Sequence, residues 1–182
     1  MQKEENKEFT LSILTENKSG LLNRITIIFT RRKINIEAIN VSETEVHGVS
    51  RFTIVVRSTH EKAVKVVKQI RKIIEVLGAF LYEEDEVHYQ EIALYKLPTK
   101  MLTSSNQIEN LVRSSGARVL TVGEEYTIIE KTGHSHEILS LLEQLKPFDV
   151  QEFIKSGRIA ISKSKRQTVS FLEEMEALSL VS

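Results

Sequence analysis

The sequence has no cysteine and no tryptophan, only two prolines among 182 residues, and few aromatic side chains. Without cysteine the chain can form no disulfide, thiolate metal site or thiol nucleophile, and the cytoplasm is the expected location. The scarcity of aromatic rings argues against a stacking platform for nucleic-acid bases. No apolar run reaches the roughly 18 residues of a membrane-spanning helix. The polar first eight residues also differ from a signal peptide. We therefore expect no membrane association.

The chain also lacks an excess of charge of either sign. Lysine and arginine together number 25, as do aspartate and glutamate, so the formal net charge is zero. A protein whose main partner is nucleic acid needs a basic surface to neutralise phosphates, and we therefore expect no nucleic-acid partner. A near-neutral chain meets less electrostatic resistance to self-association, which makes an oligomer easier.

Motifs for catalysis and metal binding are missing as well. The sequence contains no P-loop, no G-x-G-x-x-G and no G-x-S-x-G. His134 and His136 flank Ser135, but the pair lacks the nearby third ligand that a zinc site needs, so we interpret both as surface histidines. The acidic run 83–86 is interpreted as a solvated linker. We expect no catalytic residue and no metal site in this chain.

The first half of the sequence does contain a regular pattern of strands and helices. Apolar residues alternate in some segments and recur every three or four residues in others. The predicted strands are 9–15, 34–41, 50–56 and one within 75–86, and the predicted helices are 21–32 and 63–74. The order strand, helix, strand, strand, helix, strand is that of the split βαβ, or ferredoxin-like, arrangement.

The same pattern starts again near His88. The second set of predicted elements comprises strands at 91–97, 117–122 and 126–131, helices at 106–115 and 135–146, and a last β segment around 148–153. We therefore predict an α+β fold of two ferredoxin-like (βαββαβ) domains in tandem, at 1–87 and 88–165. Residues 166–182 form a tail that contains an amphipathic helix candidate, which we expect to cap the second domain in preference to docking on a partner.

The turn Asn17-Lys18-Ser19-Gly20-Leu21-Leu22 joins the first predicted strand to the first predicted helix. Glycine lets the backbone come close to a ligand because no Cβ intervenes. The first N–H groups of a helix have no partner inside it and, with the helix dipole, suit a carboxylate or a phosphate. Two interpretations remain open from the pattern: a site for a small anionic ligand, or an ordinary turn in which Ser19 caps the helix.

Asn35 is the second residue of interest, at the start of the second predicted strand. It lies by the C-terminal end of the first helix and therefore away from Gly20 in the same subunit. If two subunits pair about a twofold axis, Asn35 of one can face the Gly20 turn of the other. An amino acid would suit that pocket, with its carboxylate on the N–H groups after Gly20, its ammonium group on the Asn35 carbonyl, and an aliphatic side chain against Leu21 or Leu22. Taken alone, Asn35 is better explained as a helix-exit residue.

Several segments resemble the regulatory small subunit of acetolactate synthase (acetohydroxyacid synthase), whose first domain is an ACT domain. The resemblance covers nearly the whole chain in order. It is carried by 17–29, 31–36 and 50–56 in the first half, and by 91–94, 130–133, 145–148 and 156–160 in the second half.

The resemblance implies a regulatory subunit that is not itself an enzyme. Such a subunit binds a larger catalytic subunit, raises its activity, and confers feedback inhibition by valine or a related branched-chain amino acid. The first domain would bind the effector and form a homodimer, and the second would contact the catalytic subunit. This chain would hold no cofactor, because thiamine diphosphate, Mg and FAD would belong to the catalytic subunit.

The effector site of the resembled family can be placed on this sequence by position. It falls on Asn17, Gly20, Leu21, Leu22 and Asn23 of one subunit, and on Asn35 and Ile36 of the facing subunit.

Three departures from the family pattern affect these expectations. Ser19 stands where the family often has proline, and we expect the serine to cap the helix. Lys33 stands where glycine is usual, so a positive φ there would cost about 1 kcal/mol. Lys155-Ser156-Gly157 replaces an arginine-threonine-glycine pattern, and Ser162-Lys163-Ser164 lacks the usual arginine-glycine. We expect contact with the catalytic subunit to differ accordingly.

Two other functions were weighed. The chain could be a free-standing ACT-domain sensor of an amino acid that controls another enzyme or a transporter. It could also be a small enzyme on two ferredoxin-like domains. The enzyme hypothesis is the weakest, because the sequence offers no set of nucleophile, base and oxyanion donor.

Overall fold

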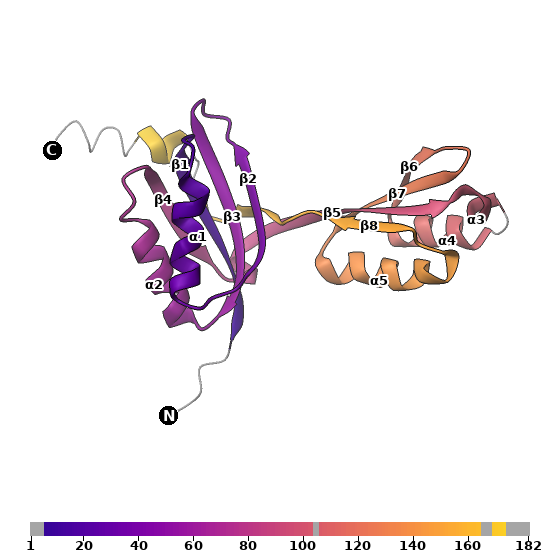
Figure 1. Ribbon diagram of the computed structural model, residues 1–182, viewed down its shortest axis with the longest axis horizontal. Helices are drawn as coiled ribbons and strands as arrows, with labels where there is room; N and C mark the ends of the chain where they lie inside the picture. The colour runs from indigo at the N-terminus through magenta and orange to yellow at the C-terminus, as the bar shows by residue number, and fades with distance from the viewer. Residues whose placement is uncertain (1–5, 104–105, 165–168, 174–182) are drawn as a thin grey trace. The chain divides into compact units, whose positions relative to one another are not determined.

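The computed structural model describes residues 6–103, 106–164 and 169–173 (Figure 1). The chain divides into two compact units. The first contains the residues up to His88 together with those from Arg158 onward, and the second spans Tyr89–Gly157. In the part of the chain that the structure describes, no helix is long and apolar enough to cross a membrane.

The first unit is an antiparallel four-stranded sheet in the order β2-β3-β1-β4, with helices α1 and α2 on one face (Figure 1). Its elements are β1 Lys7–Glu16, α1 Leu21–Arg31, β2 Ile36–Glu43, β3 Val49–Ser58, α2 His60–Ile70 and β4 Val76–Tyr82. The core forms where Phe9, Leu11 and Ile13 of β1 meet the apolar stripes of the two helices. In α1 that stripe is Leu21, Ile25 and Phe29, at intervals of four residues.

The second unit repeats this topology, with the strand order β6-β7-β5-β8. Its elements are β5 Val87–Pro98, α3 Thr99–Thr103, α4 Asn106–Ser115, β6 Arg118–Val122, β7 Tyr126–Gly133, α5 Ser135–Leu145 and β8 Glu152–Lys155. Ala93, Tyr95 and Leu97 of β5 face the helices and form the centre of the core. The prediction of two ferredoxin-like domains in tandem is therefore confirmed.

Short elements connect and extend the two units. The single-turn 3₁₀ helices η1 Glu84–Glu86 and η2 Lys146–Phe148 follow β4 and α5, and strand β9 Ile159–Ser162 pairs with β5. The acidic run predicted to be a linker is η1, closed by a bond from the Glu83 N–H to the Glu86 carboxylate. Helix α3 was not predicted, because its five residues are too few to show a helical period.

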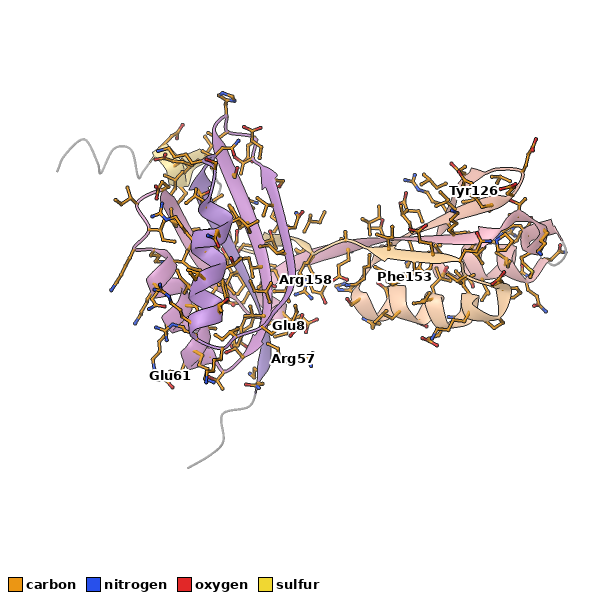
Figure 2. The ribbon with its side chains drawn as sticks, in the orientation of Figure 1. Glu8, Arg57, Glu61, Tyr126, Phe153 and Arg158 are labelled. Atoms are coloured by element: carbon orange, nitrogen blue, oxygen red, sulfur yellow. The ribbon has the colours of Figure 1, made fainter. Side chains whose placement is uncertain are left out.

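Two expectations about the C-terminal part of the chain are wrong. Residues 158–164 were assigned to the second domain, but they lie with the first unit, where the Arg158 guanidinium is paired with the Glu8 carboxylate at 2.6 Å (Figure 2). The tail helix was expected to cap the second domain. Its described part, 169–173, packs instead on the first unit, because Leu172 is buried against Leu14 and Val49. The remainder of that helix candidate lies outside the described residues.

The end of α1 has a strained conformation at Lys33, where the resembled family usually has glycine. Lys33 has a φ of 54°, in the left-handed region that disfavours any residue with a Cβ. The N–H of Lys33 donates to the Thr30 carbonyl and the N–H of Ile34 donates to the Phe29 carbonyl, both at 3.0 Å. These two bonds are those of a Schellman motif, which normally has glycine at this position. The helix exit is therefore kept, with lysine in the place of glycine.

We predict that Lys33→Gly stabilises the chain. Removing the Cβ relieves the left-handed strain, and the gain is partly offset by the greater freedom of glycine in the unfolded chain. The expected increase in the free energy of unfolding is about 0.5–1 kcal/mol, measured by urea denaturation. Lys33→Ala is the matched control. It removes the charge but keeps the Cβ, and should bring no gain. Equal stability of wild type and Lys33→Gly would contradict the strain argument.

Candidate ligand-binding site

Gly20, and not Ser19, is the N-cap of α1, with φ 82° and ψ −8°. The expectation that Ser19 caps the helix is therefore wrong. Within the described residues, no side chain caps this end of α1. A Cβ placed on Gly20 would find no atom within 4 Å, so the space beside the turn is open. The first turn of α1 thus offers uncapped N–H donors next to open space, which is the arrangement that binds anions.

Backbone bonds on both sides hold the turn in place. The N–H of Asn17 donates to the Gly48 carbonyl at 2.7 Å, and the N–H of Glu16 donates to the Glu75 carbonyl at 2.9 Å. The first bond joins the turn to the β2–β3 hairpin, and the second joins it to the residue before β4. These two bonds fix the backbone of the turn, so its N–H donors would be presented to a ligand in a single geometry.

The charged side chains around the turn are paired with one another. Arg24 donates to both carboxylate oxygens of Glu75 at 2.7 Å, and these hydrogen bonds hold the pKa of Glu75 below its ordinary value. Lys18 is ion-paired with Glu16, which raises the pKa of the lysine by a hydrogen bond and by charge attraction. Each of these two carboxylates is paired with a cation, so its repulsion of an anion is reduced. The amide donors at the start of α1 can then attract an anion.

The residues assigned to the site differ in exposure. Leu21 is only 2% exposed and belongs to the core, so its side chain is closed to a ligand. Leu22 is 48% exposed, and Asn17 and Asn23 are exposed as well. Leu22 is therefore the apolar side chain that a ligand at this turn could contact.

Asn35 and Ile36 lie at the other end of α1. The helix has eleven residues, so its ends are about 16 Å apart. Within one chain the structure therefore does not bring Asn35 to the Gly20 turn, as expected. Asn35 is exposed and its amide nitrogen donates to the Glu37 carboxylate at 3.2 Å. Ile36 is partly buried against the core of the first unit.

The histidine pair of the second unit has a structural role that sequence reasoning missed. His134 is the N-cap residue of α5, and its N–H donates to the Glu137 carboxylate at 2.7 Å. This bond lowers the pKa of Glu137. The His134 ring also stands edge-on to Tyr89, with centroids 4.4 Å apart. Among the described residues, no group of three His, Asp or Glu side chains is placed to hold a metal ion.

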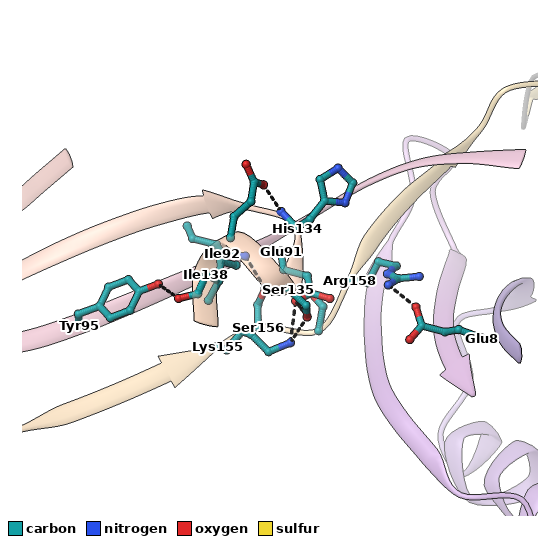
Figure 3. Close-up of polar contacts among 12 residues, drawn as sticks. Glu8, Glu91, Ile92, Tyr95, His134, Ser135, Ile138, Lys155, Ser156 and Arg158 are labelled. Carbon is teal, nitrogen blue, oxygen red and sulfur yellow. Dashed lines mark hydrogen bonds and ion pairs between the residues drawn. The ribbon is translucent and has the colours of Figure 1, made fainter. Parts of the chain in front are cut away.

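A buried polar cluster in the second unit is a further feature that the sequence did not reveal (Figure 3). Glu91 is 4% exposed and its carboxylate accepts bonds of 2.6 Å from both the Lys155 ammonium and the Ser135 hydroxyl. Lys155 also donates to the Ser135 hydroxyl at 3.1 Å. The trio joins β5, α5 and β8 through these contacts.

The neighbouring polar contacts also serve the fold. Ser156 and Ile92 exchange two bonds, from the Ser156 N–H to the Ile92 carbonyl at 2.8 Å and from the Ile92 N–H to the Ser156 hydroxyl at 3.0 Å (Figure 3). The Tyr95 hydroxyl donates to the Ile138 carbonyl at 2.8 Å, and burial raises the pKa of Tyr95 to about 12. Tyr95 therefore stays a hydrogen-bond donor at any physiological pH.

Fold and site together define a class of protein. Two ferredoxin-like domains occur in tandem, the first carries an open helix N-terminus, and the described side chains provide no assembled nucleophile and base. This combination defines the class as tandem ferredoxin-like proteins with an uncapped helix N-terminus in the first domain.

Comparison with known proteins agrees with this class. A family model described as an acetohydroxyacid synthase (AHAS) small subunit-like ACT domain matches residues 11–78, and one described as the small subunit of acetolactate synthase matches residues 90–164. The acetolactate synthase small subunit of Mycobacterium leprae is 38% identical over 157 residues, which cover 86% of this chain and 92% of that protein. The Bacillus subtilis small subunit is 35% identical over 161 residues, covering 88% and 93%.

A solved structure of an acetolactate synthase small subunit is also similar to this chain. The crystal structure of the acetolactate synthase small subunit from Thermotoga maritima superposes with a TM-score of 0.79 at 27% identity, covering 88% of this chain and 99% of that one. The chain belongs to the acetolactate synthase small-subunit family, and the resemblance seen in the sequence is confirmed.

We predict that Lys155→Met destabilises the second domain. The substitution removes the cation that faces the buried Glu91 carboxylate. Because Lys155 is 28% exposed and its charge is partly screened, the expected loss in the free energy of unfolding is about 2 kcal/mol, below the range for fully buried pairs. Denaturation followed by circular dichroism measures it.

Two further variants test the assignment of this loss to the buried charge. Adding Glu91→Gln to Lys155→Met should recover part of the loss, because no charge is then left buried. Lys146→Met, which breaks the exposed pair with Glu143, should cost less than about 0.5 kcal/mol. Similar losses for Lys155→Met and Lys146→Met would contradict the assignment.

Proposed function

We propose that this chain is the non-catalytic regulatory subunit of acetolactate synthase. In this role it raises the activity of a thiamine-diphosphate-dependent catalytic subunit and makes that activity sensitive to valine or a related branched-chain amino acid. The observation that carries the proposal is the match of both halves of the chain, in order, to models of the acetolactate synthase small subunit. Thiamine diphosphate, Mg and FAD are assigned to the catalytic subunit.

The Gly20 turn is the proposed site for the carboxylate of the effector. The uncapped N–H groups of Leu21 and Leu22 would bind it, and the exposed Leu22 side chain would contact an aliphatic group. Asn17 and Asn23 flank this position. Asn35 and Ile36 would come from a second copy. Because the Asn35 amide nitrogen is used by Glu37, its carbonyl oxygen is the atom proposed to accept a bond from the ammonium group.

A homodimer through the first domain is supported by the edge of its sheet. Strand β2 is an edge strand, and its Ile39 and Val41 side chains are exposed on the face that carries the helices. Ile27 of α1 is exposed as well. Exposed apolar side chains along an edge strand favour association with a second copy, and twofold pairing would complete the effector site.

The second domain is the proposed contact with the catalytic subunit. Every residue of its edge strand β6 is exposed, including Leu120 and Val122. Ile92 and Ile154, on adjacent strands β5 and β8, are exposed too, with Ile154 at 56%. Apolar groups exposed across neighbouring strands indicate a protein partner.

An activity assay tests the proposed function directly. The catalytic subunit is assayed alone and with this chain, and the mixture is then titrated with valine, leucine and isoleucine. We expect activity to rise when the chain is added and to fall as the recognised amino acid saturates its site. Unchanged activity in the presence of this chain would overturn the proposal. If the chain still binds the amino acid, that outcome would favour a free-standing sensor.

The effector site is tested by Gly20→Asp. The added carboxylate would lie beside the proposed carboxylate position, and repulsion should weaken valine binding by about tenfold or more. Isothermal titration calorimetry on the isolated chain measures this. Gly20→Asn is the matched control. Asparagine tolerates the left-handed conformation and has almost the same shape without the charge, so it should weaken binding much less. Equal affinities of wild type and Gly20→Asp would rule out this location of the site.

A further inference from the structure

The outer face of the first sheet, opposite α1 and α2, is covered by the chain's own C-terminal segment. Leu14 and Val49 of this face are buried together with Leu172, and Phe80 and Phe171 pack against them. We call residues 158–164 and 169–173 the strap. The family model for the second half ends at residue 164, so the 169–173 helix lies beyond the region that the model describes.

The strap is attached at its beginning by an ion pair whose arginine is buried. The Arg158 side chain is 4% exposed. It donates to the Glu8 carboxylate at 2.6 Å and to the Thr10 hydroxyl at 3.0 Å, both on β1. Further along, the Lys163 N–H donates to the Glu86 carbonyl at 2.9 Å. These bonds fix residues 158–164 to the first unit.

A ring contact attaches the far end of the strap. Phe171 stands edge-on to Phe80, with ring centroids 5.3 Å apart. It also lies directly over Gly78 of β4, where a Cβ would be 2.7 Å from the Phe171 ring carbon Cε1. Gly78 has no positive φ, so a Cβ at this position would meet no backbone strain, but the Phe171 ring would have to shift to make room for it.

Between these two attachments the strap spans a cavity of about 470 Å³. Thr10, Ser12 and Tyr82 line it from the sheet, and Ile161, Ser162 and Val169 line it from the strap. Among its described residues, the strap is therefore held over 158–163 at one end and by Phe171 and Leu172 at the other, and the cavity lies between it and the sheet. The described part of this helix, 169–173, contacts the first unit through Phe171 and Leu172.

We propose that the outer face of the first sheet is an intrachain docking surface for the strap, and that the Phe171 ring seated on Gly78 decides whether this face is covered. The strap completes a first domain whose sequence is discontinuous, and it shields Leu14, Val49 and Phe80 from a second copy of the chain. Without the ring contact the apolar face becomes accessible and self-association increases.

Gly78→Ala, Phe171→Ala and the double variant test this proposal in the full chain. The Gly78→Ala methyl group would displace the ring without removing it, and Phe171→Ala removes the ring. In each single variant we expect hydrogen-exchange protection of residues 169–173 to fall about tenfold or more, which corresponds to about 1.4 kcal/mol. Sedimentation velocity should show more concentration-dependent association than in the wild type.

The double variant and a control distinguish loss of the ring contact from a general effect. Once Gly78→Ala has displaced the ring, adding Phe171→Ala should lower protection little further. Ile74→Ala, at a side chain 89% exposed in the same unit, should behave as the wild type. Protection of β1 and β3 at wild-type level would show that the first domain is folded in each variant.

Three results would overturn the proposal. The first is that Gly78→Ala shows the same hydrogen exchange and sedimentation as the wild type. The second is that the effects of the two substitutions on protection are independent and add up in the double variant. The third is that protection is lost throughout β1 and β3. None of these measurements involves the catalytic subunit or an amino acid, so the proposal fails or survives separately from the proposed function.

Discussion

Helix α1 is packed on the first sheet by Leu21, Ile25 and Phe29, and a residue in the left-handed conformation stands at each of its ends. At the start, Gly20 begins the helix without a side-chain cap. At the finish, Lys33 turns the chain sharply into β2. The proposed site depends on this arrangement. Burial of the apolar stripe holds the helix in place, and the absence of a cap leaves its first N–H groups available to an anion. The length of α1 then separates Asn35 from Gly20 within one chain.

The two domains share a topology but differ in how polar groups are used. In the first unit the central strand β1 presents Phe9, Leu11 and Ile13 to the helices. Its Glu8, on the opposite face, is paired with the buried Arg158 side chain. In the second unit the corresponding strand β5 carries Glu91 on the helix face itself, beside Ala93 and Tyr95. A buried carboxylate is costly unless it is paired, and Lys155 and Ser135 meet that requirement. The second core therefore depends on a specific set of polar partners that the first does not need.

The order and type of most elements could be predicted from the sequence, because apolar periodicity reports which face of each element is buried. Strain at Lys33 was expected on the condition that its φ is positive, because the resembled family usually has glycine there, and the structure shows a φ of 54°. The N-cap of α1 was predicted wrongly. Ser19 and Gly20 are adjacent, both residue types are compatible with a cap, and only the backbone conformation distinguishes them. The partner of Glu91 could not be found either, because Lys155 lies 64 residues away along the chain. Part of this signal was present in the sequence, because Glu91 is a charged residue at an inward-facing position of an alternating strand.

The C-terminal helix shows where periodicity stops being informative. Its apolar face was visible in the sequence, but periodicity does not say against which surface that face packs. The contact with Gly78 offers a clue only after the structure is known, because a glycine in the middle of a strand indicates close approach without identifying the approaching group.

Because the chain returns to the first unit at Arg158, exchange of the second domain in evolution is constrained. The second domain is joined at both of its ends, after His88 and before Arg158, and so has the connectivity of an insertion. Cutting the chain at a single point near His88 would leave the first domain without its last segment. Exchange of the second domain between related proteins, by recombination or by design, therefore requires two junctions that are compatible at once. The residues on either side of each junction have to be inherited together.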